Sequence, residues 1–207
     1  MIKIILTGSI ATGKTTVADI LKKYGAIIID TDIITHQIYN HPTPTTEKIL
    51  NEFGEEYLEN GQINRKKLAE LVFKDKNALE KLNSIVHPDV RNQVKLLTEK
   101  YQKLEKENNL SYLVIYVIPL YFEVGKHYES DYVLVASCSE DNQIKRLMKR
   151  GNFSYQEARV RINAQIPISD KVKESDFVID TNQSFDKIES DLKDLIKSWE
   201  WDIYEES

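Results

Sequence analysis

The residues with the clearest chemistry form a glycine-bounded loop, Gly8 to Thr15, which directly follows the apolar segment 2–6. The loop fits the pattern G-x-x-x-x-G-K-[ST], the phosphate-binding P-loop. In such a loop the backbone N–H groups converge on phosphate oxygens, and the following helix adds the positive end of its dipole. Gly8 and Gly13 permit backbone angles and close approaches that a Cβ would hinder. The pattern therefore predicts a site for the phosphates of a nucleotide.

Within this loop, Lys14 can reach the β- and γ-phosphates and the Thr15 hydroxyl can ligate Mg²⁺. The predicted ATP-binding residues of the loop are Gly8, Ala11, Thr12, Gly13, Lys14, Thr15 and Thr16. The alternative is a chance glycine turn before a helix. The flanking segments favour the P-loop, because a short β-branched strand precedes the loop and a helical pattern over 15–23 follows it.

Five short apolar segments are predicted as strands, at 2–6, 26–30, 112–118, 132–136 and 177–179. Helical patterns separate them, which indicates an α/β fold with a parallel sheet covered by helices on both faces. Ligands of such sheets bind at the carboxyl ends of the strands. Asp30 and Asp32 flank the end of the second strand, which we expect beside the strand that leads into the phosphate loop.

The connection between the second and third strands is too long for a simple crossover helix. We expect one helix beginning at Pro44 and a second capped by Asn64. A third is expected to stop near His87-Pro88, because the residue before proline disfavours helical angles. A long polar helix then covers 89–108. This insertion is well placed to bind a second substrate; the alternative is that it only packs against the flank of the core.

A pair of arginine-rich helices forms the second distinctive stretch. Ser139 is expected to cap a helix that carries Arg146 and Arg150 on one face, and Gly151 to end it. The run from Ser154 to Glu157 is a capping box that opens the next helix, with Arg159 and Arg161. Such a pair suits a mobile lid over phosphates, and the alternative is an ordinary solvated basic surface.

Composition narrows the class of protein. The net charge of −5 argues against nonspecific nucleic-acid binding as the main role, and segment 200–206 is expected to be a solvated acidic tail. A single cysteine, Cys138, excludes an intrachain disulfide framework. No apolar run approaches the roughly 18 residues that a membrane span needs, and the start lacks the pattern of a signal peptide. We therefore expect a soluble cytoplasmic protein that binds neither nucleic acid nor membranes.

The reaction class follows from the P-loop and from motifs that the sequence lacks. No Asp-x-x-Gly follows a strand and no Asn-Lys-x-Asp segment occurs, although both are expected of regulatory GTPases. Phosphoryl transfer to a small acceptor fits better, and it requires positioning, charge neutralisation and a carboxylate near the acceptor hydroxyl. Asp32 is the candidate for that carboxylate; its alternative role is the N-cap of a helix.

Seven segments together resemble the dephospho-coenzyme A kinase family, in order and over nearly the whole chain. They are LTGSIATGKTT (6–16), IDTD (29–32), LNSIVHP (82–88), IPLYFE (118–123), QIKRLMKR (143–150), ARVRINAQ (158–165) and DFVID (176–180). The loop is common to many families, whereas the His-Pro element, the Pro-Leu-x-x-Glu element and the arginine lid with Gln165 are more discriminating.

The resemblance implies a P-loop three-layer sandwich with a five-stranded parallel sheet, a helical acceptor-binding region at about 58–108 and a lid at about 144–170. The core would comprise about 1–57, 109–143 and 171–207. The implied reaction places the γ-phosphoryl group of ATP on the ribose 3′-hydroxyl of dephospho-coenzyme A, with Mg²⁺. Implied catalytic residues are Asp32 as general base, Lys14 and Arg146. Arg150 would contact ATP, and the acceptor site would include Asp32, His87, Pro119, Leu120 and Arg161.

Two departures from the family pattern and several alternatives accompany this interpretation. Ser9 and Ala11 stand where the family's loop usually has glycine, and Thr181 stands where it usually has asparagine. His87 could instead cap the turn before Pro88. The alternative functions are another small-acceptor kinase, such as a nucleoside or nucleotide kinase, and a nucleotide-binding regulator without turnover. The expected assembly is a monomer or a weak homo-oligomer.

Overall fold

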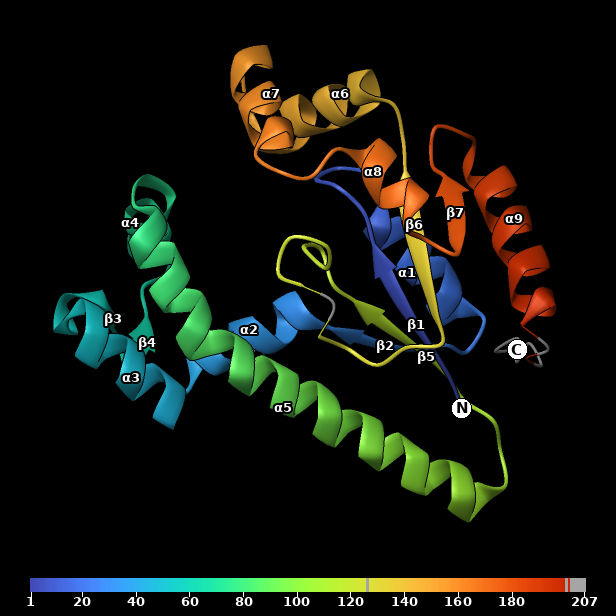
Figure 1. The fold of residues 1–207 in the computed structure, drawn as a ribbon, viewed down its shortest axis with the longest axis horizontal. Helices are drawn as coiled ribbons and strands as arrows, with labels where there is room; N and C mark the ends of the chain where they lie inside the picture. Colours follow the sequence, from blue (N-terminus) through green and yellow to red (C-terminus); the bar gives the residue numbers. More distant parts are fainter. Residues whose placement is uncertain (126, 200, 202–207) are drawn as a thin grey trace. The chain divides into compact units, whose positions relative to one another are not determined.

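The protein is described by a computed structural model, which covers residues 1–125, 127–199 and 201 (Figure 1). The elements of the main sheet and its helices are β1 (Ile2–Thr7), α1 (Lys14–Lys23), β2 (Ile27–Asp30), β5 (Leu113–Val117), β6 (Tyr132–Ser137), α6 (Glu140–Gly151), α7 (Tyr155–Asn163), α8 (Ile168–Lys173), β7 (Phe177–Asp180) and α9 (Phe185–Ser198). The long connection after β2 contains α2 (Thr31–Asn40), α3 (Pro44–Phe53), the 3₁₀ turn η1 (Glu55–Tyr57), β3 (Leu58–Glu59), β4 (Gln62–Ile63), α4 (Arg65–Lys74) and α5 (Lys76–Asn108).

The five predicted strands form one parallel sheet with the order β2-β5-β1-β6-β7. The fold class predicted from the sequence is confirmed. One placement was wrong: β5, not β2, is the neighbour of β1 on that side. The burial of the strands explains the order. All five residues of β5 are buried, which suits an interior strand, whereas Ile29 alone is fully buried in β2, which suits an edge.

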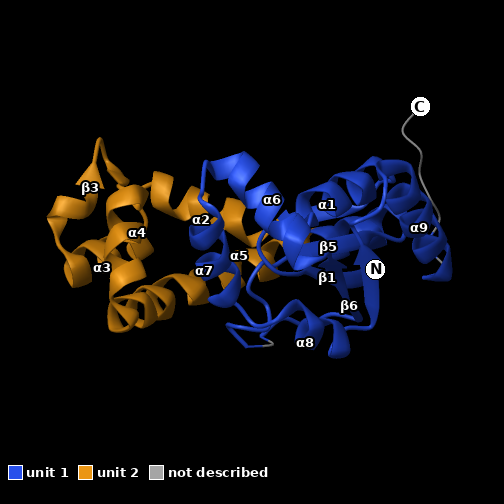
Figure 2. Cartoon of the chain, turned by 90° about the horizontal axis from the view of Figure 1, so that it is seen from above, with its two compact units in different colours: residues 1–29, 101–207 blue, residues 30–100 orange. Residues whose placement is uncertain are grey.

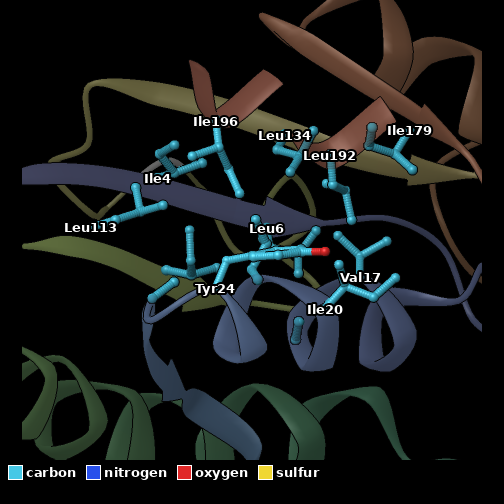
Figure 3. Close-up of a cluster of buried hydrophobic side chains, with 14 of the residues drawn as sticks. Ile4, Leu6, Val17, Ile20, Tyr24, Leu113, Leu134, Ile179, Leu192 and Ile196 are labelled. Atoms are coloured by element: carbon cyan, nitrogen blue, oxygen red, sulfur yellow. The ribbon is translucent and has the colours of Figure 1, made fainter. Parts of the chain in front are cut away.

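The main core lies between the sheet and two helices, α1 and α9, which cover one face (Figure 3). Val17 and Ile20 of α1 and Leu192 and Ile196 of α9 meet the side chains of β1, β5 and β6. Helix α8 lies against β6, and Figure 2 shows it on the opposite side of the sheet from α1 and α9. Each fully buried aliphatic side chain contributes about 1.5–3 kcal/mol, so this layer fixes the strand ends that carry the site.

The chain divides into two compact units, coloured separately in Figure 2. Unit 1 comprises Met1–Ile29 and Tyr101–Ser207, and unit 2 comprises Asp30–Lys100. Unit 2 lies within the long connection between β2 and β5. Two of its helices begin at the predicted caps: the Thr43 hydroxyl accepts from the backbone N–H of Thr46, and the Asn64 side chain accepts from Lys67.

Helix α5 corrects the prediction of a stop near His87, because it runs unbroken through Pro88. A proline inside a helix has no N–H for the carbonyl four residues earlier, here Ser84. Ser84 and Pro88 are both exposed, so water can satisfy that carbonyl. On the other side of the helix Leu82, Val86 and Val90 are buried in a continuous stripe. Burial of this stripe on both sides of the proline outweighs the lost hydrogen bond.

Among the described residues, no helix combines the length and apolar character that crossing a membrane requires. Of segment 200–206, expected to be a solvated acidic tail, only Trp201 lies within the described residues. Its side chain is buried, and its indole N–H donates to the carbonyl of Ser111 at 2.9 Å. The rest of that prediction lies outside the described residues.

Candidate functional site

The phosphate loop connects β1 to α1 and has the expected backbone features. Gly8 has φ +151°, and a Cβ built there would lie 2.4 Å from the carbonyl oxygen of Ala136, so the close approach of β6 requires glycine. Gly13 has φ +88° and directly precedes α1. Ala11, one of the two residues that stand in place of glycine, adopts the left-handed region with φ +59°. The phosphate loop thus has a left-handed backbone conformation at position 11 even without a glycine there.

Lys14 and Thr15 lie at the start of α1. The Lys14 ammonium donates to the carbonyl oxygens of Ser9 at 2.8 Å and Gly8 at 3.4 Å, so it lies over the loop. Thr15 is exposed in the first turn of the helix. No cluster of three or more acidic, histidine or cysteine side chains suited to a metal occurs among the described residues. The Thr15 hydroxyl is an oxygen ligand of the kind that Mg²⁺ accepts, since Mg²⁺ keeps several waters and is commonly held by one or two protein ligands together with substrate phosphates.

The two arginine-rich helices have the predicted caps. Ser139 accepts from Asn142 at the start of α6, and α6 ends at Gly151. Ser154 and Glu157 form the predicted capping box of α7. The two helices share a small core of Ile144, Leu147 and Ala158, against which Ile10 and Ala11 of the phosphate loop pack. The helix pair is therefore attached directly to the loop.

The three arginines of the predicted lid have different surroundings. The Arg146 guanidinium donates to the carbonyls of Ala11 at 3.2 Å and Thr181 at 2.6 Å, and to the Thr181 hydroxyl at 3.1 Å. Arg150 is exposed in the last turn of α6. Arg161 lies 4.2 Å from the ring centre of Phe153, a cation–π contact. Arg146 thus contacts the phosphate loop directly, through the Ala11 carbonyl.

The residues after β5 are joined to α8 and to the turn that precedes it. Leu120 is exposed, and the carbonyl of Pro119 accepts a 3.5 Å hydrogen bond from the Thr7 hydroxyl at the end of β1. Glu123 forms a 2.6 Å ion pair with the fully buried ammonium of Lys171 in α8, and it accepts from the backbone N–H of Ile166 at 3.2 Å. Charge pairing of this kind makes burial of Lys171 tolerable.

Asp30 and Asp32 have different roles at the start of α2. The Asp30 carboxylate is the N-cap, since it accepts from the backbone N–H groups of Asp32 at 2.8 Å and Ile33 at 3.3 Å. The alternative that Asp32 is the cap is therefore wrong. Asp32 instead lies within the first turn, exposed, where its carboxylate can meet a ligand.

Asp32 lines a cleft of about 440 Å³ within unit 2. The lining combines polar and charged groups with an apolar floor: Asp32, Thr35, His36, Tyr39, Arg65, Lys66, Leu68, Ala69, Val72 and Leu82. Burial raises the pKa of Tyr39 to about 12, so its hydroxyl keeps its proton and can donate. Arg65 and Lys66 begin α4, where they add two cations to the positive end of the helix. The cleft therefore suits an anionic ligand that also has an apolar portion.

His87 lies on α5 and is half-buried, but it does not line this cleft. Its neighbour Pro88 lines a separate cleft of about 410 Å³ in unit 2, together with Pro44, Thr45 and Asp89 among others. The Thr45 hydroxyl donates to the Asp89 carboxylate at 2.7 Å. Because α5 is continuous, the alternative that His87 caps a turn before Pro88 is wrong.

Sequence reasoning missed Arg65, Lys66 and Tyr39 as cleft residues. The available signal was the Asn64 cap, since cations directly after an N-cap lie at a helix end that already attracts anions. It also assigned no role to Gln143. The buried Gln143 amide donates to the carbonyl of Ile10 at 2.7 Å, and Gln165 accepts from the N–H of the same residue at 2.7 Å.

Comparison with known proteins indicates a kinase, in agreement with the phosphate loop and the cleft described above. Residues 2–187 match the model of a protein family described as dephospho-CoA kinase. A dephospho-CoA kinase of Listeria monocytogenes is 39% identical over 195 residues, 93% of this chain and 94% of that protein. One from Carboxydothermus hydrogenoformans is 39% identical over 197 residues, 95% of this chain and 93% of that protein.

A solved structure of the dephospho-CoA kinase from Campylobacter jejuni superposes with a TM-score of 0.60 at 30% identity. The match covers 95% of this chain and 96% of that one. A shikimate kinase from Bacteroides thetaiotaomicron, 17% identical with a TM-score of 0.51 over 96% of this chain and 98% of that one, shares the fold.

Proposed function

Because the chain belongs to the dephospho-CoA kinase family, we propose that it transfers the γ-phosphoryl group of ATP to the ribose 3′-hydroxyl of dephospho-coenzyme A. The products are ADP and coenzyme A. The observation that supports the acceptor half is the cleft in unit 2, where the Asp32 carboxylate shares the lining with two cations and an apolar floor. An acceptor of this kind carries a hydroxyl, phosphates and apolar surface.

On the donor side, the phosphate loop binds the phosphates through backbone N–H groups and the dipole of α1. Lys14 exchanges the carbonyls of Ser9 and Gly8 for phosphate oxygens, which are stronger acceptors because they are charged. Thr15 would hold Mg²⁺, which would neutralise charge on the phosphates. Arg146, Arg150 and Arg161 supply further positive charge from the lid, as the family resemblance implies.

On the acceptor side, the Asp32 carboxylate accepts the proton of the 3′-hydroxyl or orients that hydroxyl for in-line attack. The Asp30 cap holds the first turn of α2, so Asp32 needs no capping role. Arg65 and Lys66 attract the acceptor's diphosphate, and Tyr39 donates a hydrogen bond. His87, Pro119 and Leu120 complete the acceptor residues that the family resemblance implies. Transfer needs little covalent chemistry from the protein, so positioning and charge account for most of the rate.

The test is an acceptor screen with purified protein, ATP and Mg²⁺, with ADP measured by a coupled assay and the product identified by mass spectrometry. We expect ADP formation to depend on dephospho-coenzyme A and the new phosphate to be on the 3′-oxygen. Adenosine and deoxyadenosine serve as competing acceptors. Faster transfer to a nucleoside would replace the proposal with a nucleoside kinase, and tight ATP binding without transfer to any acceptor would indicate a regulator.

A further inference from the structure

Three successive carbonyl groups of the phosphate loop each accept a hydrogen bond from a side chain distant in the sequence. The carbonyls of residues 10, 11 and 12 accept from Gln143 Nε2 at 2.7 Å, Arg146 Nη1 at 3.2 Å and Thr181 Oγ1 at 2.7 Å. Gln143 and Arg146 belong to α6, and Thr181 follows β7. We call these three side chains the loop frame.

Holding a carbonyl in place also orients an N–H group. The peptide unit is planar and trans, so its carbonyl and the following N–H point in opposite directions. The hydrogen bond from Gln143 therefore sets the direction of the Ala11 N–H, and the one from Thr181 sets that of the Gly13 N–H. In a phosphate loop, it is the N–H groups that bind the ligand. The loop frame thus acts on the ligand-binding groups from the opposite side of the loop.

The loop needs external support at Ala11. A residue with a Cβ costs roughly 1–2 kcal/mol in the left-handed region, and Ala11 has φ +59°. Such conformations persist where the surrounding structure determines them. Here the Ala11 carbonyl is bonded to Arg146, and Ala11 itself packs against the shared core of α6 and α7. Where the family usually has a flexible glycine, this chain fixes the same region from outside.

The bonds of Gln143 and Thr181 are well shielded from water, since each residue is only 1% exposed. The Thr181 hydroxyl has one proton, which goes to the carbonyl of Thr12 at 2.7 Å rather than to that of Ser137 at 3.2 Å. Its oxygen accepts from Arg146 at 3.1 Å. Thr181 also fills the space beside Gly13, where a Cβ would lie 3.0 to 3.2 Å from its atoms. Thr181 therefore links the loop to Arg146.

We infer that Gln143 and Thr181 are positioning residues of the phosphoryl-transfer reaction, which orient the N–H groups of Ala11 and Gly13 toward the phosphates of the nucleotide. This inference rests on the proposed function, because it takes ATP to be the ligand of the loop. Neither side chain needs to touch the nucleotide. The substrate affected by their loss is ATP, and the acceptor is unaffected.

The test uses substitutions that keep the shape and remove the donor: Thr181→Val and Gln143→Met. We expect the KM for ATP and the Kd for MgATP, measured by calorimetry, to rise about three- to tenfold in Gln143→Met, which loses one hydrogen bond to the loop. The rise should be at least as large in Thr181→Val, which loses the bond to the Thr12 carbonyl and also the acceptor of Arg146. The KM for dephospho-coenzyme A should stay within twofold. Thr181→Ser keeps the hydroxyl and should restore the wild-type values. Gln156→Met, the same exchange at an exposed position on α7, is the matched control.

The inference is overturned if both variants bind MgATP as wild type does, or if the KM values for ATP and acceptor rise together. Failure of Thr181→Ser to restore MgATP binding would also overturn the role of that hydroxyl. Circular dichroism and the thermal midpoint establish that each variant is folded before it is compared. If wild type binds MgATP but does not use dephospho-coenzyme A, the proposed acceptor is wrong. The calorimetric comparison of MgATP binding still tests whether Gln143 and Thr181 position the loop.

Discussion

Two of the groups that Lys14 contacts are weaker acceptors than the phosphate oxygen that we propose as its ligand. Its ammonium donates to two neutral carbonyls of the loop, at 2.8 and 3.4 Å. Both bonds already have an ionised donor, but a phosphate oxygen is also charged and adds an ion-pair attraction that a carbonyl lacks, so we expect a phosphate oxygen to displace these carbonyls. We expect the Lys14 ammonium to bind the loop carbonyls when no nucleotide is present and the phosphates when one is. Removal of this side chain should therefore affect catalysis far more than folding.

Replacement of Lys14 by alanine should lower kcat/KM for ATP by about 10²–10³-fold, the usual effect of losing one group that stabilises transition-state charge. The thermal midpoint should stay close to that of wild type. Lys22→Ala removes an exposed cation from the end of the same helix and should leave the rate unchanged. Wild-type activity in folded Lys14→Ala protein would contradict the role.

Replacement of Asp32 by asparagine keeps the size of the side chain and removes the base. We expect kcat to fall by about 10²–10⁴-fold, as is typical for loss of a general base, with little change in MgATP affinity. The Asp30 cap is intact in this variant, so the start of α2 should persist. Glu47→Gln, an exposed carboxylate in the first turn of α3, is the matched control. A change in kcat of less than about twofold would reject the assignment, since general bases contribute far more.

At the scale of elements, α5 keeps a proline in its interior at a measurable cost. Pro88 removes one backbone hydrogen bond, although the buried stripe of Leu82, Val86 and Val90 holds the helix on both sides. The sequence rule that proline ends a helix failed here, because that rule weighs only local backbone angles. Tertiary burial of an apolar face overrides it, as it overrides propensity generally.

Pro88→Ala should therefore raise the free energy of unfolding by about 1–3 kcal/mol, the cost of an interior proline less the freedom that alanine returns to the unfolded chain. Urea denaturation followed by circular dichroism measures this change. Asn92→Ala, an exposed substitution on the same helix, should gain no more than about 0.7 kcal/mol from propensity alone. An equal or smaller gain for Pro88→Ala would show that Pro88 costs the protein no more stability than an ordinary residue of the helix does.

The capping box of α7 makes the start of this lid helix sensitive to pH. Hydrogen bonds from the backbone N–H and then the side chain of Ser154 lower the pKa of Glu157. Because the pKa is lower in the folded state, the contribution of Glu157 is present above the carboxyl's ordinary pKa and is lost as pH falls through the folded-state value. At neutral pH the cap is at full strength.

We expect α7 to fray below the ordinary pKa of a glutamate, which NMR shifts of its first-turn amides can follow. Ser154→Ala removes the hydroxyl that donates to Glu157. In this variant the start of α7 should already be frayed at neutral pH, and the shifts of its first-turn amides should respond less to acidification. Ser184→Ala removes the N-cap of α9, whose third helical residue is Lys187 rather than a glutamate. This change should leave the pH response of α7 unchanged. An identical acid response in wild type and Ser154→Ala would contradict the role of this cap.

At the scale of the molecule, the residues that we propose for the donor and for the acceptor belong to different compact units. The phosphate loop, the loop frame and the lid lie in unit 1, and Asp32 with its cleft lies in unit 2. Ligands that bind a folded region slow its local opening and hence its hydrogen exchange. Each substrate should therefore protect a different set of amides.

Hydrogen exchange measured by mass spectrometry should show protection by MgADP in segment 8–16 and in α6. Dephospho-coenzyme A, added without nucleotide, should protect α2 and the start of α4. Helix α3, which lines neither the loop nor the Asp32 cleft, serves as the internal reference within unit 2. Protection of α4 by MgADP, with none by dephospho-coenzyme A, would place the nucleotide in the cleft and reject the acceptor assignment.

The sequence by itself determined the features that depend on neighbouring residues. The phosphate loop, the five strands and the caps at Thr43, Asn64 and Ser139 follow from local backbone angles and from hydrogen bonds between residues a few positions apart. The family motifs, read in order, then indicated the kinase family, which the comparisons confirm. The roles of individual site residues stay predictions until the variants are measured.

Only the tertiary structure decided the order of the strands, the continuity of α5, the cationic lining of the Asp32 cleft and the loop frame. The hydrogen bond from Thr181 to Thr12 joins residues 169 positions apart, and that from Gln143 to Ile10 spans 133. No local pattern encodes such pairs, because they form only when a buried sheet brings distant strand ends together. Burial also makes them matter, since a carbonyl shielded from water needs a partner from the chain itself.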